Sequence, residues 1–222
     1  MDRFSLTNTS TSSDGLPCTL WLPDSAPTGC VLMGHGLGVD REHATNQIAV
    51  DALLPHGLAV LAMDAPLHGE RQSRPYTPLA RVEAWQAYWR DRGHKELHTE
   101  WVALADYAAE RLEVSLGYWG LSLATQYGVP FLAKDHRIKA GVLGLHGEGV
   151  VLAHYAPRIT QPVYFIEQTE DELHPRESTE ALFSHLGSEV KELDSNPGAH
   201  AEVPLTAITR AASFLAERVP AL

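Results

Sequence analysis

The stretch LGYWGLSLA, residues 116–124, joins a short apolar run to the start of a helix-compatible segment. The motif GLSLA follows the run at once, so the chain must turn sharply from a strand into a helix. Small residues two positions before and two positions after Ser122 relieve the crowding that such a strained turn creates. The turn would expose the Ser122 hydroxyl and aim the Leu123 N–H at the group that the hydroxyl attacks. The pattern therefore predicts a nucleophilic serine at the end of a buried strand.

Short apolar runs recur along the rest of the chain, and segments of helix length separate several of them. Such runs are typical of strands buried on both faces of a parallel sheet that helices cover. Two segments of alternating polarity, 4–9 and 18–22, come first, and the turn-rich TSSDG between them predicts an antiparallel hairpin. The other predicted strands are 30–33, 58–63, 116–119, 140–145, 163–166 and an edge strand at 190–193.

Two segments have the apolar spacing of amphipathic helices. Residues 95–112 place one apolar face on a helix, and a second helix is expected near the C-terminal end. Strands that alternate with helices predict an α/β sandwich with a mostly parallel sheet and helices on both faces. We expect one domain over residues 1–222, with ligands bound where the parallel strands end. The apolar positions are Leu97, Trp101, Leu104, Ala105, Ala108 and Leu112, then Leu205, Ile208, Ala212 and Leu215.

The composition is that of a soluble globular protein, with 44% hydrophobic and 20% charged residues. The net charge of −11 repels phosphate backbones and anionic lipid, so no nucleic-acid or membrane partner is expected. The first residues lack a signal-peptide pattern, and no apolar run is long enough to span a bilayer. Cys18 and Cys30 lack CxxC spacing, so neither a disulfide framework nor a thiol-ligated metal is supported. A cytoplasmic location is expected.

A serine nucleophile needs a general base and an acid that orients the base. The segment EQTEDELHP places Asp171 in a loop just beyond the strand predicted at 163–166. His200 lies in the turn-forming NPGAH, where it has the exposure that a general base needs. Glu170 and Glu172 flank Asp171, so the acid could be one residue away.

The glycine-rich GHGLG, residues 34–38, follows the strand predicted at 30–33. Close backbone approach there would let the Leu37 N–H act as a second oxyanion donor beside that of Leu123. His35 in this turn is expected to brace the loop through hydrogen bonds, and His68 is also expected to be structural.

Three other polar residues have competing interpretations. His94 and His98 have the spacing of a helical metal pair but no convincing third ligand, so a solvated helix face is expected and no metal is predicted. Glu148 is either a substitute acid or a pocket residue.

Residues 71–93 carry Trp85 and Trp89 among several arginines. The segment is either a flap that covers a substrate pocket, with these indoles in contact with substrate, or a helix whose aromatic side chains pack on the sheet. The sequence leaves both open.

The motifs together resemble the α/β-hydrolase superfamily, and more narrowly its dienelactone-hydrolase-like and small-esterase branches. The resemblance covers about residues 17–218 and includes the chain order Ser, Asp, His. One departure is Ala124, which stands where the family usually has a second glycine. The matching segments are GHGLG, DAPLHGER, GLSLA, KDHRIKAGVLG, PVYFIEQTEDELHP and GAH.

The resemblance implies Ser122 as nucleophile, His200 as base, Asp171 as acid, and Leu37 and Leu123 as oxyanion donors. It also implies hydrolysis of the carboxylic ester of a small or medium-sized molecule through an acyl-enzyme, without a cofactor. Lactone, thioester, peptide or carbon–carbon bond cleavage remains open, as does a low-turnover ligand-binding protein of the same fold. Only a short segment follows the strand at 140–145, so no lid domain is expected. A homo-oligomer is left open.

Overall fold

The apolar runs form the centre of an eight-stranded sheet with the order β1-β2-β4-β3-β5-β6-β7-β8. The computed structural model of the protein describes residues 1–6 and 15–219. Strands β1 and β2 pair antiparallel, as do β2 and β4, and every other pair is parallel. The strands are β1 (Asp2–Leu6), β2 (Leu16–Trp21), β3 (Gly29–Met33), β4 (Leu58–Met63), β5 (Ser115–Trp119), β6 (Ile138–Gly144), β7 (Val163–Gln168) and β8 (Lys191–Asn196).

The fold predicted from the sequence is confirmed. Strands β3, β4, β5 and β7 are buried along their whole length, as expected for continuous apolar runs in a parallel sheet. The opening pair is antiparallel, and β8 is an edge strand, as predicted. The first strand, predicted at 4–9, begins earlier, at Asp2, and residues 7–9 lie outside the described residues.

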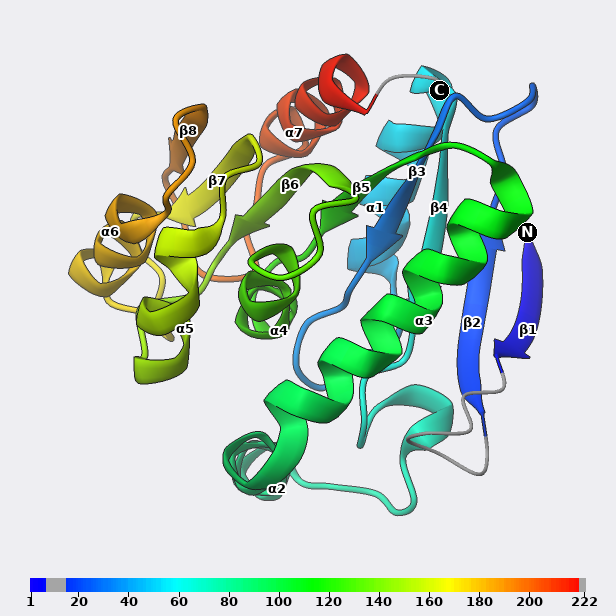
Figure 1. Cartoon of the computed structure of the whole chain (residues 1–222). Helices are drawn as coiled ribbons and strands as arrows, with labels where there is room; N and C mark the ends of the chain where they lie inside the picture. The colour runs from blue at the N-terminus through cyan, green and yellow to red at the C-terminus, as the bar shows by residue number, and fades with distance from the viewer. Residues whose placement is uncertain (7–14, 220–222) are drawn as a thin grey trace.

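Helices cover both faces of this sheet (Figure 1). Side chains of α1 (Ala44–Leu53) and α7 (Leu205–Arg218) form one core with one face of the sheet. The remaining helices contribute to the core on the opposite face. These are α2 (Pro78–Tyr88), α3 (His94–Leu112), α4 (Leu123–Leu132), α5 (Val150–Tyr155) and α6 (Arg176–His185).

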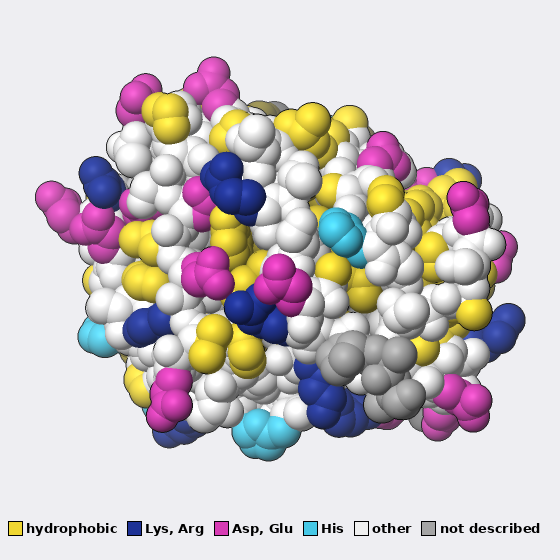
Figure 2. Space-filling view, turned by 90° about the horizontal axis from the view of Figure 1, so that it is seen from above, with side chains coloured by type: hydrophobic (Ala, Val, Ile, Leu, Met, Phe, Trp, Pro, Cys, Tyr) yellow, Lys and Arg dark blue, Asp and Glu magenta, His cyan; other side chains and the backbone are white. Residues whose placement is uncertain are grey.

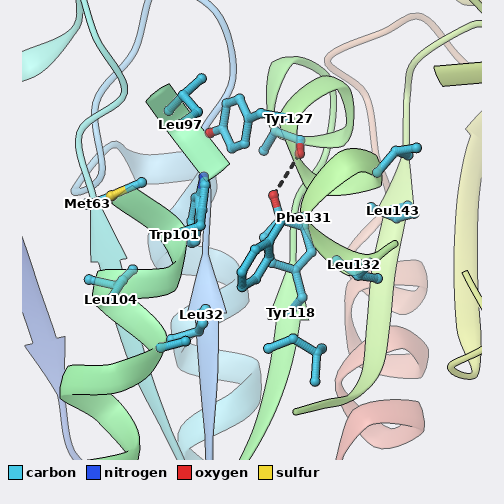
Figure 3. Packing of buried hydrophobic residues seen from close by; sticks show 14 of the residues in the cluster. Leu32, Met63, Leu97, Trp101, Leu104, Tyr118, Tyr127, Phe131, Leu132 and Leu143 are labelled. Atoms are coloured by element: carbon cyan, nitrogen blue, oxygen red, sulfur yellow. Dashed lines mark hydrogen bonds between the residues drawn. The ribbon is translucent and has the colours of Figure 1, made fainter. Parts of the chain in front are cut away.

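Aromatic side chains join α3 and α4 to the sheet (Figure 3). The ring of Trp101 on α3 stacks on Tyr127 of α4, with centroids 5.7 Å apart, and meets Tyr118 of β5 edge-on at 5.3 Å. The Tyr118 hydroxyl donates a 2.7 Å hydrogen bond to the carbonyl of Ala124. Because Ala124 lies in the first turn of α4, this packing fixes the helix that begins at the predicted nucleophile.

The segment 71–93 contains α2 and a π-helical turn, Trp89–Gly93. Trp85 and Trp89 are 3% and 8% exposed and belong to the main hydrophobic core. The Trp85 Nε1–H donates a 2.7 Å hydrogen bond to Gln126 of α4. This burial corresponds to the packing alternative for the two indoles.

The connection from β6 to β7 carries only α5 and the short 3-10 turn Ala156–Arg158. No lid domain is present there, as expected. Among residues 1–6 and 15–219, no helix is both long and apolar enough to cross a membrane. On the face shown in Figure 2, acidic and basic side chains lie interspersed, although the chain carries a net charge of −11.

Candidate active site

Ser122 lies in the sharp turn between β5 and α4. Its φ of 56° is in the left-handed region that non-glycine residues rarely adopt. Its main-chain N–H donates a 2.9 Å hydrogen bond to the carbonyl of Gly144 at the end of β6. Its own carbonyl accepts from the Thr125 N–H at 2.9 Å, which starts the helix. The strained conformation is therefore held from both sides.

The turn depends on small residues around the serine. A Cβ atom on Gly120 would lie 2.6 Å from the hydroxyl oxygen of Tyr118 and 2.8 Å from the carbonyl oxygen of Ala124. A Cβ on Gly34, just after β3, would lie 2.6 Å from the Cβ of Ala124. The alanine that replaces the family's second glycine thus fits because Gly34 leaves room for it.

His200 and Asp171 come from the loops that follow β8 and β7, the last two strands of the sheet. His200 Nε2 lies 2.9 Å from Ser122 Oγ, and His200 Nδ1 lies 2.7 Å from Asp171 Oδ2. A neutral imidazole in this arrangement donates its Nδ1–H to the carboxylate and accepts the serine proton at Nε2. The structure therefore brings the three residues into one hydrogen-bonded chain.

Main-chain donors hold the other oxygen of the Asp171 carboxylate. The N–H groups of Leu173 and His174 donate to Oδ1 at 2.8 and 3.0 Å. Burial by itself would raise the pKa of Asp171, but the hydrogen bonds from His200 and from these two N–H groups lower it below its ordinary value. The carboxylate is thus kept ionised.

The neighbouring acids have different places. The side chain of the exposed Glu172 accepts a 3.0 Å hydrogen bond from the main-chain N–H of His200. The carboxylate of Glu148 pairs with His185, and its N–H donates to Ser178 Oγ at 2.9 Å. Within the described chain, neither side chain bonds the His200 imidazole, and Asp171 alone occupies the place of the acid.

The two N–H groups predicted as oxyanion donors lie in the loop 34–38 and at the start of α4. Within the part of the chain that the structure describes, the N–H groups of Leu37 and Leu123 make no backbone hydrogen bond. Leu37 is 36% exposed, and Leu123 is the first residue of α4, whose N-terminal N–H groups have no partner within the helix. Neither N–H group is therefore committed to a main-chain carbonyl of the described residues.

His35 braces this loop, as expected. Its Nε2 accepts a 2.9 Å hydrogen bond from the Ala65 N–H, and its Nδ1 lies 2.8 Å from the Gly36 carbonyl. The Tyr127 hydroxyl contacts the His35 main chain, at 3.2 Å from N and 3.3 Å from O. Burial lowers the pKa of His35 to about 4, so the ring is neutral at neutral pH and holds the turn as a neutral tautomer.

Two histidines beside the site were not found from the sequence. The rings of His146, just after β6, and His174, three residues after Asp171, lie with centroids 4.5 Å apart. The His174 ring also lies 5.8 Å from that of His200. The segment DELHP offered one signal, because a residue three positions after the acid can point back toward it; nothing in the sequence singled out His146.

The structure corrects one expectation about α3. His94 and His98 are half-buried rather than solvated, and their rings lie 6.0 Å from Trp89 and 6.3 Å from Phe131. Across residues 1–6 and 15–219, no group of three or more His, Cys, Asp or Glu side chains is arranged to hold a metal ion.

The fold matches solved structures. A cold-adapted esterase from an Arctic intertidal metagenomic library, in a complex with polyethylene glycol, is 32% identical with a TM-score of 0.86, over 98% of this chain and 93% of that chain. The chain belongs to the α/β-hydrolase superfamily. The relative that is 32% identical is an esterase.

More distant α/β hydrolases share the fold at lower identity. Est1E from Butyrivibrio proteoclasticus is 17% identical with a TM-score of 0.71, over 94% of this chain and 98% of that chain. A dienelactone hydrolase from Anabaena variabilis is 21% identical with a TM-score of 0.70, over 98% of this chain and 96% of that chain. No protein-family model and no curated protein sequence matches the chain.

Proposed function

We propose that the protein is a serine hydrolase that cleaves carboxylic esters of small or medium-sized molecules through an acyl-enzyme on Ser122. The observation that carries the proposal is the hydrogen-bonded chain from Ser122 Oγ to His200 at 2.9 Å and from His200 to Asp171 at 2.7 Å. Support also comes from the similarity to the cold-adapted esterase, whose sequence aligns over nearly the whole chain.

In the proposed reaction, Ser122 Oγ attacks the ester carbonyl while His200 Nε2 takes the hydroxyl proton. The N–H groups of Leu37 and Leu123 donate to the oxyanion of the tetrahedral intermediate, an interaction typically worth about 3 kcal/mol for each donor. The imidazolium of His200 then protonates the leaving alcohol. Water clears the acyl group by the same steps, with His200 again acting as the base.

Asp171 stays ionised throughout this cycle. It holds the His200 imidazole in the tautomer with a proton on Nδ1 and stabilises the imidazolium that forms. The three hydrogen bonds that lower the pKa of Asp171 favour this role, because they stabilise the carboxylate before the reaction begins.

The test combines a covalent probe with turnover. The wild-type protein and Ser122→Ala are incubated with a fluorophosphonate, intact masses are recorded, and hydrolysis of p-nitrophenyl acetate, butyrate and octanoate is followed. Ser184→Ala, a change at an exposed helical serine, is the matched control. We expect labelling and turnover for wild type and Ser184→Ala, and neither for Ser122→Ala; an unlabelled wild type would contradict the proposal.

The same assay separates the alternatives left open by the sequence. Thioester, lactone and peptide substrates compared at equal concentration with the p-nitrophenyl esters identify the preferred bond. A single slow turnover with tightly retained product would favour a ligand-binding member of the superfamily over an enzyme.

A further inference from the structure

His146, His174 and His200 form a column of three rings beside Ser122. The rings of His146 and His174 are tilted by 31° with centroids 4.5 Å apart, and those of His174 and His200 by 44° at 5.8 Å. All three side chains are half-buried. Only the last of the three takes part in the hydrogen-bonded chain of the proposed reaction.

The far end of the column is fixed to the turn that holds the nucleophile. His146 Nδ1 lies 2.7 Å from the Gly147 carbonyl. The preceding Leu145 has a φ of 51°, and its N–H donates to the Ile166 carbonyl at 3.0 Å. Gly144, directly before it, accepts from the Ser122 N–H. The turn 144–146 therefore sets the positions of Ser122 and of His146 together.

The near end is fixed to the acid. The main-chain N–H of His174 donates to Asp171 Oδ1, while its ring faces the ring of His200. Burial lowers the pKa of His174. The pKa of His146 is lowered to about 4, mainly by burial and to a smaller extent by the nearby His174. Both rings are neutral at neutral pH, so they do not repel the imidazolium that His200 becomes.

We propose that His174, backed by His146, is a positioning residue that limits rotation of the His200 ring and keeps Nε2 directed at Ser122 Oγ. The inference rests on the proposed function. His200 is on a loop, and its ring is held by one bond to Asp171 at Nδ1 and one to Ser122 at Nε2. Once Ser122 is acylated its hydroxyl proton is gone, and the bond to Asp171 alone leaves the ring free to turn. A packed ring on one side removes this freedom. Small losses of alignment between a base and its nucleophile are costly in rate.

Steady-state kinetics of His174→Ala and His174→Phe on p-nitrophenyl butyrate test the inference. We expect kcat to fall about 10- to 100-fold in His174→Ala with KM within about twofold of wild type, and to recover in His174→Phe, which restores a ring. His136→Ala, at an exposed histidine after α4, is the control and should match wild type. A wild-type kcat in His174→Ala, or an equal loss in both variants, would overturn the inference.

A second measurement does not need ester turnover. In protein labelled with ¹⁵N-histidine, the Nδ1 proton of His200 is identified by its loss in Asp171→Asn. We expect this signal in wild type and His174→Phe, and exchange broadening in His174→Ala. An unchanged signal in His174→Ala would refute the positioning role; a changed signal in a protein that hydrolyses no ester would refute only the proposed function. If His174→Ala melts near the assay temperature, His174→Ser carries the same expectations.

Discussion

The carbonyl oxygen of Gly144 accepts a 2.9 Å hydrogen bond from the main-chain N–H of Ser122, so the end of β6 holds the strained residue at the end of β5. Gly144 has a φ of 148°, and a Cβ atom there would lie 2.1 Å from the carbonyl oxygen of Ile166. Only glycine allows the end of β6 to approach β7 in this way.

Gly144→Ala is therefore expected to lower the free energy of unfolding by about 3 kcal/mol or more, because the backbone of β7 blocks the new side chain. Gly149→Ala is the control, since a Cβ there meets nothing within 4 Å, and its effect should stay within about 0.5 kcal/mol. Urea unfolding followed by circular dichroism checks both. Equal stability of the two variants would contradict the steric argument.

Asp171→Asn should lower kcat about 10⁴-fold, because an amide stabilises the wrong tautomer of His200 and cannot balance the imidazolium charge. Glu172→Gln keeps an oxygen for the His200 N–H and should stay within about twofold of wild type. Hydrolysis of p-nitrophenyl butyrate compares them. The reverse order of effects would move the role of the acid to Glu172.

The Thr125 hydroxyl lies in the first turn of α4 and links two strand ends. Its Oγ1 lies 2.8 Å from the Gly120 carbonyl and 2.6 Å from that of Gly144, and it accepts from the Gly144 N–H at 2.8 Å. Thr125→Val keeps the shape and removes these bonds, so the free energy of unfolding should fall by about 1–3 kcal/mol.

Thr209→Val is the matched control for that change, because the Thr209 hydroxyl is exposed and bonds only the Leu205 carbonyl. Its effect should be within about 0.5 kcal/mol in the same urea titration. If Thr209→Val lowered the free energy of unfolding as much as Thr125→Val does, the hydrogen bonds of the Thr125 hydroxyl would contribute no more stability than an exposed one.

We expect two buried histidines, His35 and His68, to make the free energy of unfolding depend on pH. Burial lowers the pKa of His35 to about 4. The pKa of His68 is also lowered to about 4, mainly by burial and to a smaller extent by the nearby His35. An unfolded histidine titrates near pH 6.5, so between pH 6.5 and 4 the unfolded chain binds more protons. The free energy of unfolding should therefore fall as the pH drops through this window, by up to about 1.4 kcal/mol per pH unit for each histidine.

Urea titrations at several pH values between 7 and 4 measure that slope. His68→Asn keeps a donor for the Pro66 carbonyl, which the His68 Nδ1 contacts at 2.8 Å, and removes the titrating ring. Its slope should be smaller than that of wild type. An identical dependence of the free energy of unfolding on pH in the variant and in wild type would mean that His68 binds protons equally in the folded and unfolded chain, which would contradict the prediction.

The strands were predictable where both faces are buried, because burial on both faces leaves an unbroken apolar run. Strand β4 coincides with the predicted run 58–63. Strand β6 begins at Ile138, two residues before the predicted start, because the exposed Lys139 interrupts the apolar run and hides the beginning of the strand. A helix within residues 71–93 was one of two alternatives left open. Thr77 before Pro78 is a helix-start signal that marks where α2 begins, because the Thr77 hydroxyl accepts from the Ala80 N–H.

The residues of the candidate site could be predicted from the sequence only in part. Ser122 is marked by its own local motif, whereas the choice among Glu170, Asp171 and Glu172 depends on loop geometry that no local pattern specifies. The place of His146 beside the site depends on how the loops after β6 and β7 face each other. That arrangement follows from strand order and register and cannot be read from residue spacing.

The order of the strands along the chain has a consequence for biosynthesis. Ser122 follows β5, but Gly144, Asp171 and His200 are carried by the ends of β6, β7 and β8. A nascent chain that lacks β8 would hold the serine with no group to accept its proton. Under the proposed mechanism, efficient hydrolysis begins only after β8 has joined the sheet, so incomplete chains that lack this strand would not provide an active esterase before synthesis is finished.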